Sequence, residues 1–246
     1  MYSNYSIDIN CDVGEGVGNE HLLLPYISSC NIACGAHAGS VATIDNVIHL
    51  AKKHQVKIGA HPSFPDRKNL GRAVLPISSE ALQESIEEQI RLLKERADLQ
   101  GVKLHHVKPH GALYNVIAKD KKMAQLVIRA IQNTCSNVFL YVPYNSVIAE
   151  EAVKKNLQIV YEAFADRNYN DDLSLVSRSK ENALITDKEA VFIHIKNIIL
   201  HQKVTTIAGT RKIIADTICV HGDTKNAVAL VAYIHAKLKE NNIQIA

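Results

Sequence analysis

The feature that most constrains the fold of this chain is a repeated alternation of short β-branched runs with amphipathic stretches. Each run ends in a polar or glycine-containing loop, and apolar residues at helical spacing follow it. Seven runs have this character: 6–12, 30–35, 56–61, 104–110, 137–143, 158–164 and 216–222. The amphipathic stretches are 43–54, 78–101, 121–133, 145–156, 187–202 and 224–241. Strands that alternate with helices indicate βα units, and therefore a mostly parallel sheet under a helical cover.

Seven such units within 246 residues predict a closed β/α barrel rather than an open sheet. Because no linker or low-complexity tract interrupts them, we expect a single α/β domain over residues 1–246. Segment 164–186 has no clear period and predicts a long loop, which in a compact domain is commonly functional or mobile. Residues 203–218 predict a small hairpin that turns near Gly209. Since Trp is absent and aromatic residues are few, the core must rest on Ile, Leu, Val and Ala.

The charge balance argues against nucleic acid as a partner. The chain has 28 basic and 25 acidic residues, a formal net charge of +3, and no long basic run. Its start lacks the basic and apolar regions of a signal peptide, and no apolar stretch approaches the roughly 20 residues of a membrane helix. Five cysteines, an odd number, are typical of reduced thiols. We therefore expect a cytoplasmic protein that binds neither nucleic acid nor membrane.

Polar and titratable residues gather where the predicted strands end. In a parallel β/α barrel all strand C-termini lie on one face, where loops build the active site, so these residues are expected to converge. They are Asp12 and Glu15 after the first strand, His37 after the second, His61 at the end of the third, Lys108 and His110 in the fourth, Asp166 and Arg167 after the sixth, and His221 and Asp223 at the seventh.

Structural explanations compete with these functional ones. Asp12 could cap the following helix, and a single histidine after a strand is more often a hydrogen-bonded structural residue than a ligand. Several histidines at equivalent strand ends favour a site, because burying basic groups together is costly without an anion or a metal. His105 and His106 alternate on a strand, so one of them should face the helices. The GEGVG sequence at 14–18 only weakly suggests a phosphate loop.

The chemistry of these residues favours hydrolysis or ring opening at a carbonyl. The most natural metal-binding trio is Asp12, His37 and His61, which could hold a divalent cation that activates water. Lys108 either has a lowered pKa and transfers protons, or stays charged and binds the carboxylate of a small anionic substrate. Asp12 and Glu15 are candidates for a general acid or base. No dinucleotide fingerprint supports redox chemistry.

Together these segments resemble the LamB/YcsF family. The matching motifs are IDINCDVGEGVG, NIACGAHAG, IGAHPSFPDRKNLGR, HVKPHGALYN, FADRNY and DTICVHGD, which span residues 7–223. The resemblance implies a barrel similar to the glycoside hydrolase/deacetylase barrels. It implies ATP-dependent opening of 5-oxo-L-proline to L-glutamate, with ATP as cofactor and two partner subunits, B and C.

The resemblance also assigns roles to the residues at the strand ends. It implies catalysis by Asp12, Glu15, His61, Lys108 and His110, and substrate binding by His37, Asp166, Arg167, His221 and Asp223. The Asp–His–His metal site of the related deacetylases maps to Asp12, His37 and His61.

Departures from the family pattern leave alternatives open. The chain has Ala36 and Ser40 in the second loop, and the sequence of residues 172–175, Ser177 and Asn182 alter the sixth loop. A related lactam or amide is therefore a second candidate substrate. A metal-dependent amide hydrolase or deacetylase that needs no ATP, and a binding protein that sequesters a small anion, are the other functions considered. The oligomeric state is also open, a homo-oligomer included.

Overall fold

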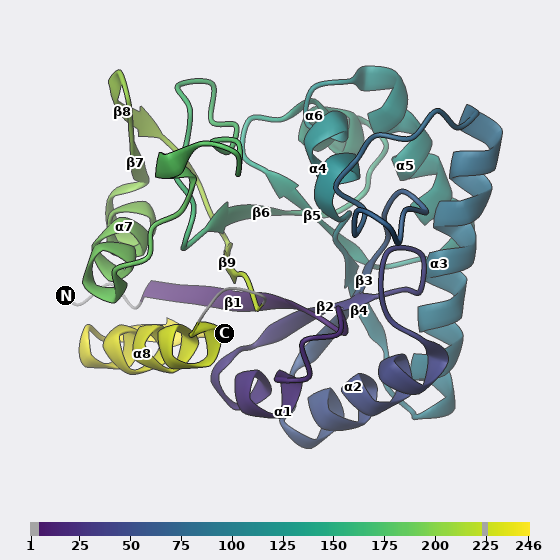
Figure 1. Cartoon of the computed structure of the whole chain (residues 1–246), viewed down its shortest axis with the longest axis horizontal. Coiled ribbons are helices and arrows are strands. Elements are labelled where there is room, and N and C mark those ends of the chain that lie inside the picture. Colours follow the sequence, from purple (N-terminus) through teal and green to yellow (C-terminus); the bar gives the residue numbers. More distant parts are fainter. Residues whose placement is uncertain (1–4, 223–225) are drawn as a thin grey trace.

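Seven parallel strands close into a barrel in the computed structural model, which describes residues 5–222 and 226–246 (Figure 1). The strands are β1 (Tyr5–Val13), β2 (Ser29–Ala33), β3 (Lys57–His61), β4 (Leu104–Val107), β5 (Phe139–Pro143), β6 (Ile159–Phe164) and β9 (Thr217–Val220). Each pairs with the next in parallel, and β9 pairs with β1, where Thr217 lies opposite Asp8. The predicted closed barrel of seven strands is thereby confirmed.

Helices surround this barrel, and all six predicted helical stretches contain one (Figure 1). The helices are α1 (Glu20–Leu23), α2 (Val41–Lys53), α3 (Ser79–Leu99), α4 (Gly111–Ile117), α5 (Lys121–Thr134), α6 (Val147–Lys154), α7 (Lys188–His201) and α8 (Ala227–Glu240). Five of them start at a Ser or Asp whose side chain accepts an N–H of the first turn, at Ser40, Ser78, Asp120, Ser146 and Asp187. The sequence did not indicate α1 and α4, since four and seven residues are too few to display a helical period.

Shorter elements complete the fold. Strand β10 (Ile243–Ile245) pairs in parallel with the start of β1, outside the barrel. Strands β7 (Lys203–Thr206) and β8 (Gly209–Lys212) form the predicted antiparallel hairpin. Two one-turn 3₁₀ helices, η1 (Leu24–Tyr26) and η2 (Glu181–Ala183), lie in loops. Among the described helices, none combines the length and apolar character that crossing a membrane would require.

The segment 164–186 is a long loop, as predicted, and it is ordered by its own backbone pairing. Arg167 pairs with Leu184, and Tyr169 pairs with Leu175. The Asp171 carboxylate accepts hydrogen bonds from the Thr206 hydroxyl and the Ala208 amide, so the loop is attached to the β7–β8 hairpin.

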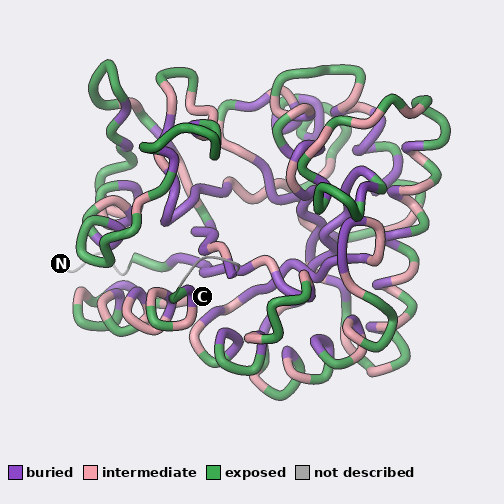
Figure 2. Tube along the Cα trace, viewed as in Figure 1, coloured by how far each residue is buried: buried purple, intermediate pink, exposed green. Residues whose placement is uncertain are grey.

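The apolar core lies between the strands and the helices, and Figure 2 shows the strands and the inner sides of the helices buried. It consists mainly of Ile, Leu, Val and Ala, as the composition predicts. The alternation along β1 places Ile7, Ile9 and Cys11 in this core.

The interior of the barrel is polar, which differs from the branched apolar layers common in β/α barrels. The alternate residues of β1, namely Asp8, Asn10 and Asp12, point inward and are hydrogen-bonded there. Asp8 accepts bonds from Ser29 and Thr217, at the end of the barrel that is distant from the C-terminal ends of the strands. Polar groups are tolerated inside a barrel when their partners are present, because an unpaired buried polar group is costly.

A middle layer is built around Asn10 and Asn31. The Asn10 amide donates to Glu162 Oε1 at 3.0 Å, and its oxygen accepts from Asn31 at 2.7 Å. His106 Nε2 lies 2.7 Å from the oxygen of Asn31, and its ring stacks on Tyr141 with 3.9 Å between centroids. The neighbouring His105 instead contacts Phe139 and is partly exposed, so the predicted alternation of the two histidines is confirmed.

We predict that Gly59→Ala destabilises the barrel through His106. A Cβ at residue 59 would lie 2.1 Å from His106 Nε2, and this ring is fully buried and held by Asn31 and Tyr141. The substitution should lower the free energy of unfolding by about 1–3 kcal/mol, as overpacking does. In a His106→Ala background the same change should cost much less, because the two sites are coupled. Equal losses in both backgrounds, measured by denaturant unfolding, would contradict this explanation.

Candidate active site

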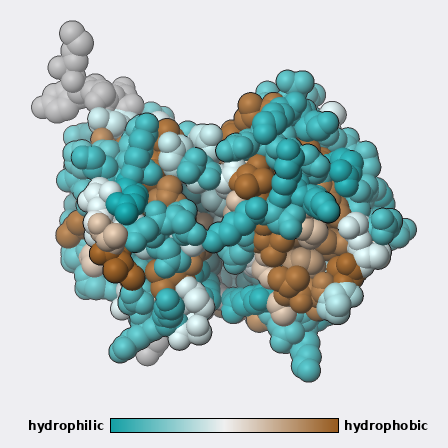
Figure 3. Space-filling model, turned by 90° about the horizontal axis from the view of Figure 1, so that it is seen from above, coloured by the Kyte–Doolittle hydropathy of each residue, from teal (hydrophilic) through white to brown (hydrophobic). Residues whose placement is uncertain are grey.

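A cavity of about 1270 Å³ opens at the C-terminal ends of the strands. Asp12, His61, Lys108 and His221 line its base, and each comes from the end of a different strand. Helix α4 and the loop 164–186 form the walls. Seen from above the view of Figure 1, the surface is mostly hydrophilic and is hollowed in the middle (Figure 3). The structure therefore brings these four residues together, as the polarity of a parallel barrel predicts.

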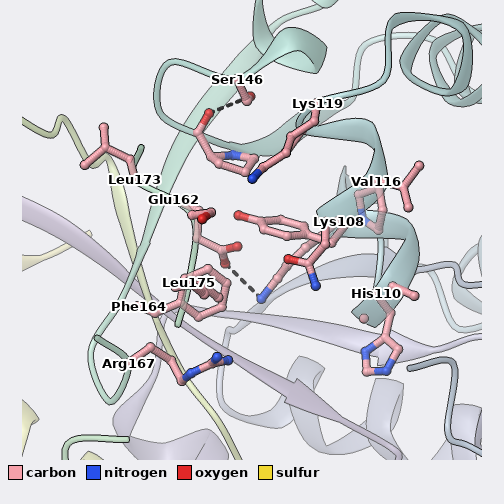
Figure 4. A pocket seen from close by; sticks show the side chains of 18 of the residues that line it. Lys108, His110, Val116, Lys119, Ser146, Glu162, Phe164, Arg167, Leu173 and Leu175 are labelled. Atoms are coloured by element: carbon pink, nitrogen blue, oxygen red, sulfur yellow. Dashed lines mark hydrogen bonds and ion pairs between the residues drawn. The ribbon is translucent and has the colours of Figure 1, made fainter. Parts of the chain in front are cut away.

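Lys108 is the cation at the base of this cavity. Its Nζ lies 2.9 Å from Asp12 Oδ1. The same atom lies 2.8 Å from Glu162 Oε1, and Figure 4 shows this ion pair. It also contacts Cys219 Sγ at 3.1 Å and Asn10 Oδ1 at 3.3 Å. Burial alone would lower the pKa of Lys108, but Asp12, Cys219 and Glu162 outweigh it and raise the pKa well above its usual value. Of the two predicted behaviours, the structure therefore favours a lysine that stays charged.

The tautomers of His61 and His110 follow from their backbone partners. His61 Nδ1 lies 2.7 Å from the carbonyl oxygen of Lys108, and His110 Nε2 lies 2.9 Å from that of Leu70. A carbonyl oxygen only accepts, so these two nitrogens carry the ring protons. In the neutral rings His61 Nε2 and His110 Nδ1 therefore have lone pairs, and these two atoms face each other at 2.9 Å. Two lone pairs repel each other at this distance, so the contact requires a proton on one of the two nitrogens or a cation between them.

The tautomer of His37 is fixed through Ser63. The Ser63 hydroxyl donates to the carbonyl oxygen of Phe64 at 2.8 Å, so it accepts from His37 Nδ1, which also lies 2.8 Å away. His37 Nε2 then presents its lone pair toward Glu15 at 3.3 Å. The ring stacks on His110 with 4.0 Å between centroids. Burial lowers the pKa of His37, and it lowers the pKa of His110 to about 3, so both rings are neutral near pH 7.

Two carboxylates complete the cluster. Asp12 Oδ2 lies 3.4 Å from His61 Nε2, and Glu15 Oε1 lies 3.3 Å from His110 Nδ1. Burial would raise the pKa of Asp12, but His61 and Lys108 lower it well below its usual value. Three ring nitrogens and two carboxylates thus direct electron pairs toward one region.

The atoms of this cluster have spacings suitable for a metal ion in two combinations. These are Asp12 with His61 and His110, and Glu15 with His37 and His110, whose ligand atoms lie within 4.8 Å of one another. The trio expected from the sequence, Asp12, His37 and His61, is not one of these combinations. His110 replaces a member because its Nδ1 lies beside His61 Nε2, while His37 is held by Ser63 and directed at Glu15. Imidazole nitrogens and carboxylates are ligands suited to Zn²⁺ and similar divalent ions.

Asp166, Arg167 and His221 follow the C-terminal ends of β6 and β9. Asp166 is buried, and its carboxylate accepts from His221 Nδ1 at 2.8 Å. His221 lowers the pKa of Asp166 against the effect of burial. Arg167 donates to the carbonyl oxygens of Val176 and Ala183, so it orders the loop 164–186 beside the cavity. Asp223 lies outside the described residues.

The sequence did not single out Glu162, Asn10 or Tyr114. Glu162 is the only charged residue in the run 158–164, which was a usable signal for an inward-facing polar group. Tyr114 gave none, because helix α4 itself was not predicted. The GEGVG segment contains Glu15, which belongs to the cluster. The Gly14 amide donates a hydrogen bond to the Glu20 carboxylate at 3.1 Å, so this amide is not available to bind a phosphate.

The closed barrel and the cluster of acids, histidines and lysine at its mouth define the general class: a β/α-barrel protein with an enzyme-type site. Comparison with known sequences identifies the group within that class. Residues 7–246 match the LamB/YcsF family, and the chain belongs to this family.

Its relatives are similar along nearly the whole chain. The 5-oxoprolinase A subunit of Clostridium beijerinckii is 41% identical over 98% of this chain and 97% of its own length. The 5-oxoprolinase A subunit of Haemophilus influenzae is 39% identical over 97% of this chain and 98% of its own. The crystal structure of a lactam utilization protein from Thermus thermophilus is 34% identical, with a TM-score of 0.91 and 98% of both chains covered.

We predict that Lys108→Met strongly destabilises the fold. The substitution leaves the Asp12 and Glu162 carboxylates buried and close together without the ammonium group between them. Breaking a buried ion pair in this way should lower the free energy of unfolding by about 3–5 kcal/mol near neutral pH. The control is Lys94→Met, which removes an exposed helical ion pair with Asp98 and should change stability little. If denaturant unfolding gave similar values for both variants, the structural importance of Lys108 would be refuted.

Proposed function

We propose that this chain is the A subunit of an ATP-dependent 5-oxoprolinase, which opens 5-oxo-L-proline to L-glutamate. The observation that carries the proposal is the meeting of a charged Lys108, the Asp12 carboxylate and the histidines at the base of one cavity. Hydrolysis at a carbonyl needs groups of these kinds: a base for water, and positive charge near the developing anion. The near full-length similarity to 5-oxoprolinase A subunits supports the same substrate.

The role of ATP follows from the stability of the substrate. A lactam is an amide, and transfer of a phosphoryl group from ATP to its carbonyl oxygen would create a better electrophile for water. The chain has no G-x-x-x-x-G-K-[ST] sequence. We therefore assign part of the ATP site to partner subunits B and C.

In this mechanism the neutral histidines and the carboxylates share the proton transfers. His37 Nε2 carries a lone pair near pH 7 and can accept a proton from the attacking water. Lys108 remains charged, and it stabilises negative charge that develops at the substrate carbonyl.

We further propose that Asp12, His61 and His110 hold a divalent cation. The fit rests on the second partners of the rings, which direct two imidazole lone pairs at the same point beside a carboxylate. When bound, such an ion lowers the pKa of water and polarises a carbonyl group. Glu15 and His37, directed at the same region, would orient the water and accept its proton.

We predict ATP-dependent formation of glutamate from 5-oxoproline when the chain is assembled with its B and C subunits. Lys108→Ala should reduce the rate at least a thousandfold, because it removes the charge at the carbonyl and also unbalances Asp12 and Glu162. Lys94→Ala, on the outer side of α3, is the matched control and should keep the wild-type rate. Glutamate formation by Lys108→Ala at the control rate would remove Lys108 from the mechanism, and its absence with the wild-type chain would refute the function.

We predict about one equivalent of a divalent metal per chain in protein purified without chelators, measured by elemental analysis. His110→Ala should abolish this binding, whereas His105→Ala, on the outer face of β4, should leave it unchanged. Equal metal content in the two variants, or none in the wild type, would contradict the assignment.

The same ligand set makes an ATP-independent, metal-dependent amide hydrolase the second candidate function. Metal-dependent amide hydrolysis by the isolated chain, without ATP and without partners, would favour it over the first.

A further inference from the structure

We propose that Glu162 and Tyr114 recognise the amide edge of a lactam. In this arrangement Glu162 Oε2 accepts the lactam N–H, and the Tyr114 hydroxyl donates to the lactam carbonyl oxygen. The inference rests on the proposed function, because it specifies how a 5-oxoproline-type ring is selected in the same cavity.

The starting observation is a pair of buried polar atoms that the protein leaves unsatisfied. Within residues 5–222 and 226–246, neither the Tyr114 hydroxyl nor Glu162 Oε2 has a partner with hydrogen-bonding geometry. The two residues are only 6% and 2% exposed, yet both line the cavity. Buried polar groups are nearly always paired, so two neighbouring groups at a cavity wall that lack a well-formed hydrogen bond leave room for a ligand that bonds to both.

The position of Glu162 Oε2 is fixed by the other oxygen of the same carboxylate. Glu162 Oε1 lies 2.8 Å from Lys108 Nζ, and it accepts the Asn10 amide at 3.0 Å. These contacts hold the carboxylate of Glu162 within β6, and Figure 4 shows Glu162 and Lys108 directed at one another. An ionised carboxylate oxygen can only accept, so the group that completes Oε2 must be a donor.

Tyr114 supplies the complementary donor. Its ring packs edge to face on Phe164, with 5.8 Å between centroids, which limits its movement. Burial raises the pKa of Tyr114, and the nearby Glu162 carboxylate raises it further, so the hydroxyl keeps its proton. Part of this shift comes from a direct interaction of the Tyr114 hydroxyl with the Glu162 carboxylate, so the two groups are neighbours whose geometry falls short of a well-formed hydrogen bond. The wall therefore presents one donor and one acceptor side by side.

A lactam is the natural complement of this pair. Its amide bond is held cis by the ring, so the N–H and the carbonyl oxygen lie on the same edge. In an ordinary trans peptide they point in opposite directions. A neighbouring donor and acceptor can therefore bind both groups of a lactam at once but only one group of a linear amide.

The surroundings suit the rest of such a ring. Phe164 and Leu175 lie beside the pair and provide an apolar wall for ring methylenes (Figure 4). The Lys108 ammonium group contacts both Glu162 and Asp12. A lactam bound to Glu162 would therefore lie close to the cluster of Asp12 and the histidines. Recognition and chemistry would thus meet at the carbonyl of the substrate.

The test is calorimetric binding of three ligands to the purified full chain. They are 5-oxo-L-proline, its N-methyl derivative, and the lactone in which oxygen replaces the ring N–H. The wild-type chain should bind the lactam at least tenfold more tightly than either analogue, because both leave Glu162 Oε2 unpaired. Tyr114→Phe should weaken lactam binding about tenfold. Glu162→Gln should reduce the discrimination between lactam and lactone, since its amide can turn a donor toward the ring oxygen.

The matched control is Tyr233→Phe. The Tyr233 hydroxyl is also buried without a hydrogen-bonding partner among the described residues, but it lies on α8, outside the cavity lining. It should bind all three ligands as the wild type does. Equal affinities of the wild-type chain for lactam and lactone, or unchanged lactam binding by Tyr114→Phe, would overturn the inference. So would a lack of any binding by the wild-type chain.

Turnover by the assembled complex separates this inference from the proposed function. Glutamate formation together with equal lactam and lactone binding would refute the recognition pair and leave the function standing. Selective lactam binding without ATP-dependent turnover would support the pair and refute the function.

Discussion

The buried charge of Lys108 is the interaction on which the rest of the structure depends. Its ammonium group joins side chains of β1, β6 and β9, through Asp12, Glu162 and Cys219. Its backbone carbonyl also holds the ring of His61. One residue at the end of β4 therefore connects strands across the barrel and orients the first histidine of the cluster. Because buried charges are costly without partners, this arrangement requires the polar interior that lies beneath it.

That polar interior explains how so many titratable groups share one small space. Each histidine ring of the cluster has a hydrogen-bond partner that fixes its orientation. The partners are backbone carbonyl groups for His61 and His110, and the Ser63 hydroxyl for His37. The folded chain thus uses its hydrogen bonds for positioning, and the lone pairs that remain converge beside Asp12 and Glu15. Such preorganisation lets polar groups stabilise a transition state without rearranging during the reaction.

The sequence was sufficient for the framework and for the residues at the strand ends. Alternating periodicities predicted the seven strands, six helices and the hairpin, and the common polarity of parallel strands predicted that Asp12, His61 and Lys108 would meet. The polar layers inside the barrel were not predicted. Polar and apolar residues alternate along β1 in the same way whether the polar residues face water or the barrel interior. Glu162 lies within a strand, so a rule based on strand ends did not select it.

The grouping of the histidines could not be predicted because it depends on how loops pack. Gly111 approaches the backbone of Gly71 so closely that a Cβ there would lie 2.6 Å from the Gly71 carbonyl oxygen. This contact directs the chain after Lys108 so that His110 lies beside His61. Nor does spacing along the chain reveal whether Lys108 has a raised or a lowered pKa, since Glu162 and Cys219 come from strands distant in sequence.

The central claim is that fixed partners turn the lone pairs of these histidines toward one point. The most direct test is ¹⁵N NMR of the histidine ring nitrogens near pH 7, in protein from which metal has been removed with a chelator. His37→Ala and His110→Ala variants would assign the signals. The account predicts that His110 is protonated only at Nε2 and His37 only at Nδ1. Opposite tautomers, or a doubly protonated ring at either position, would contradict it.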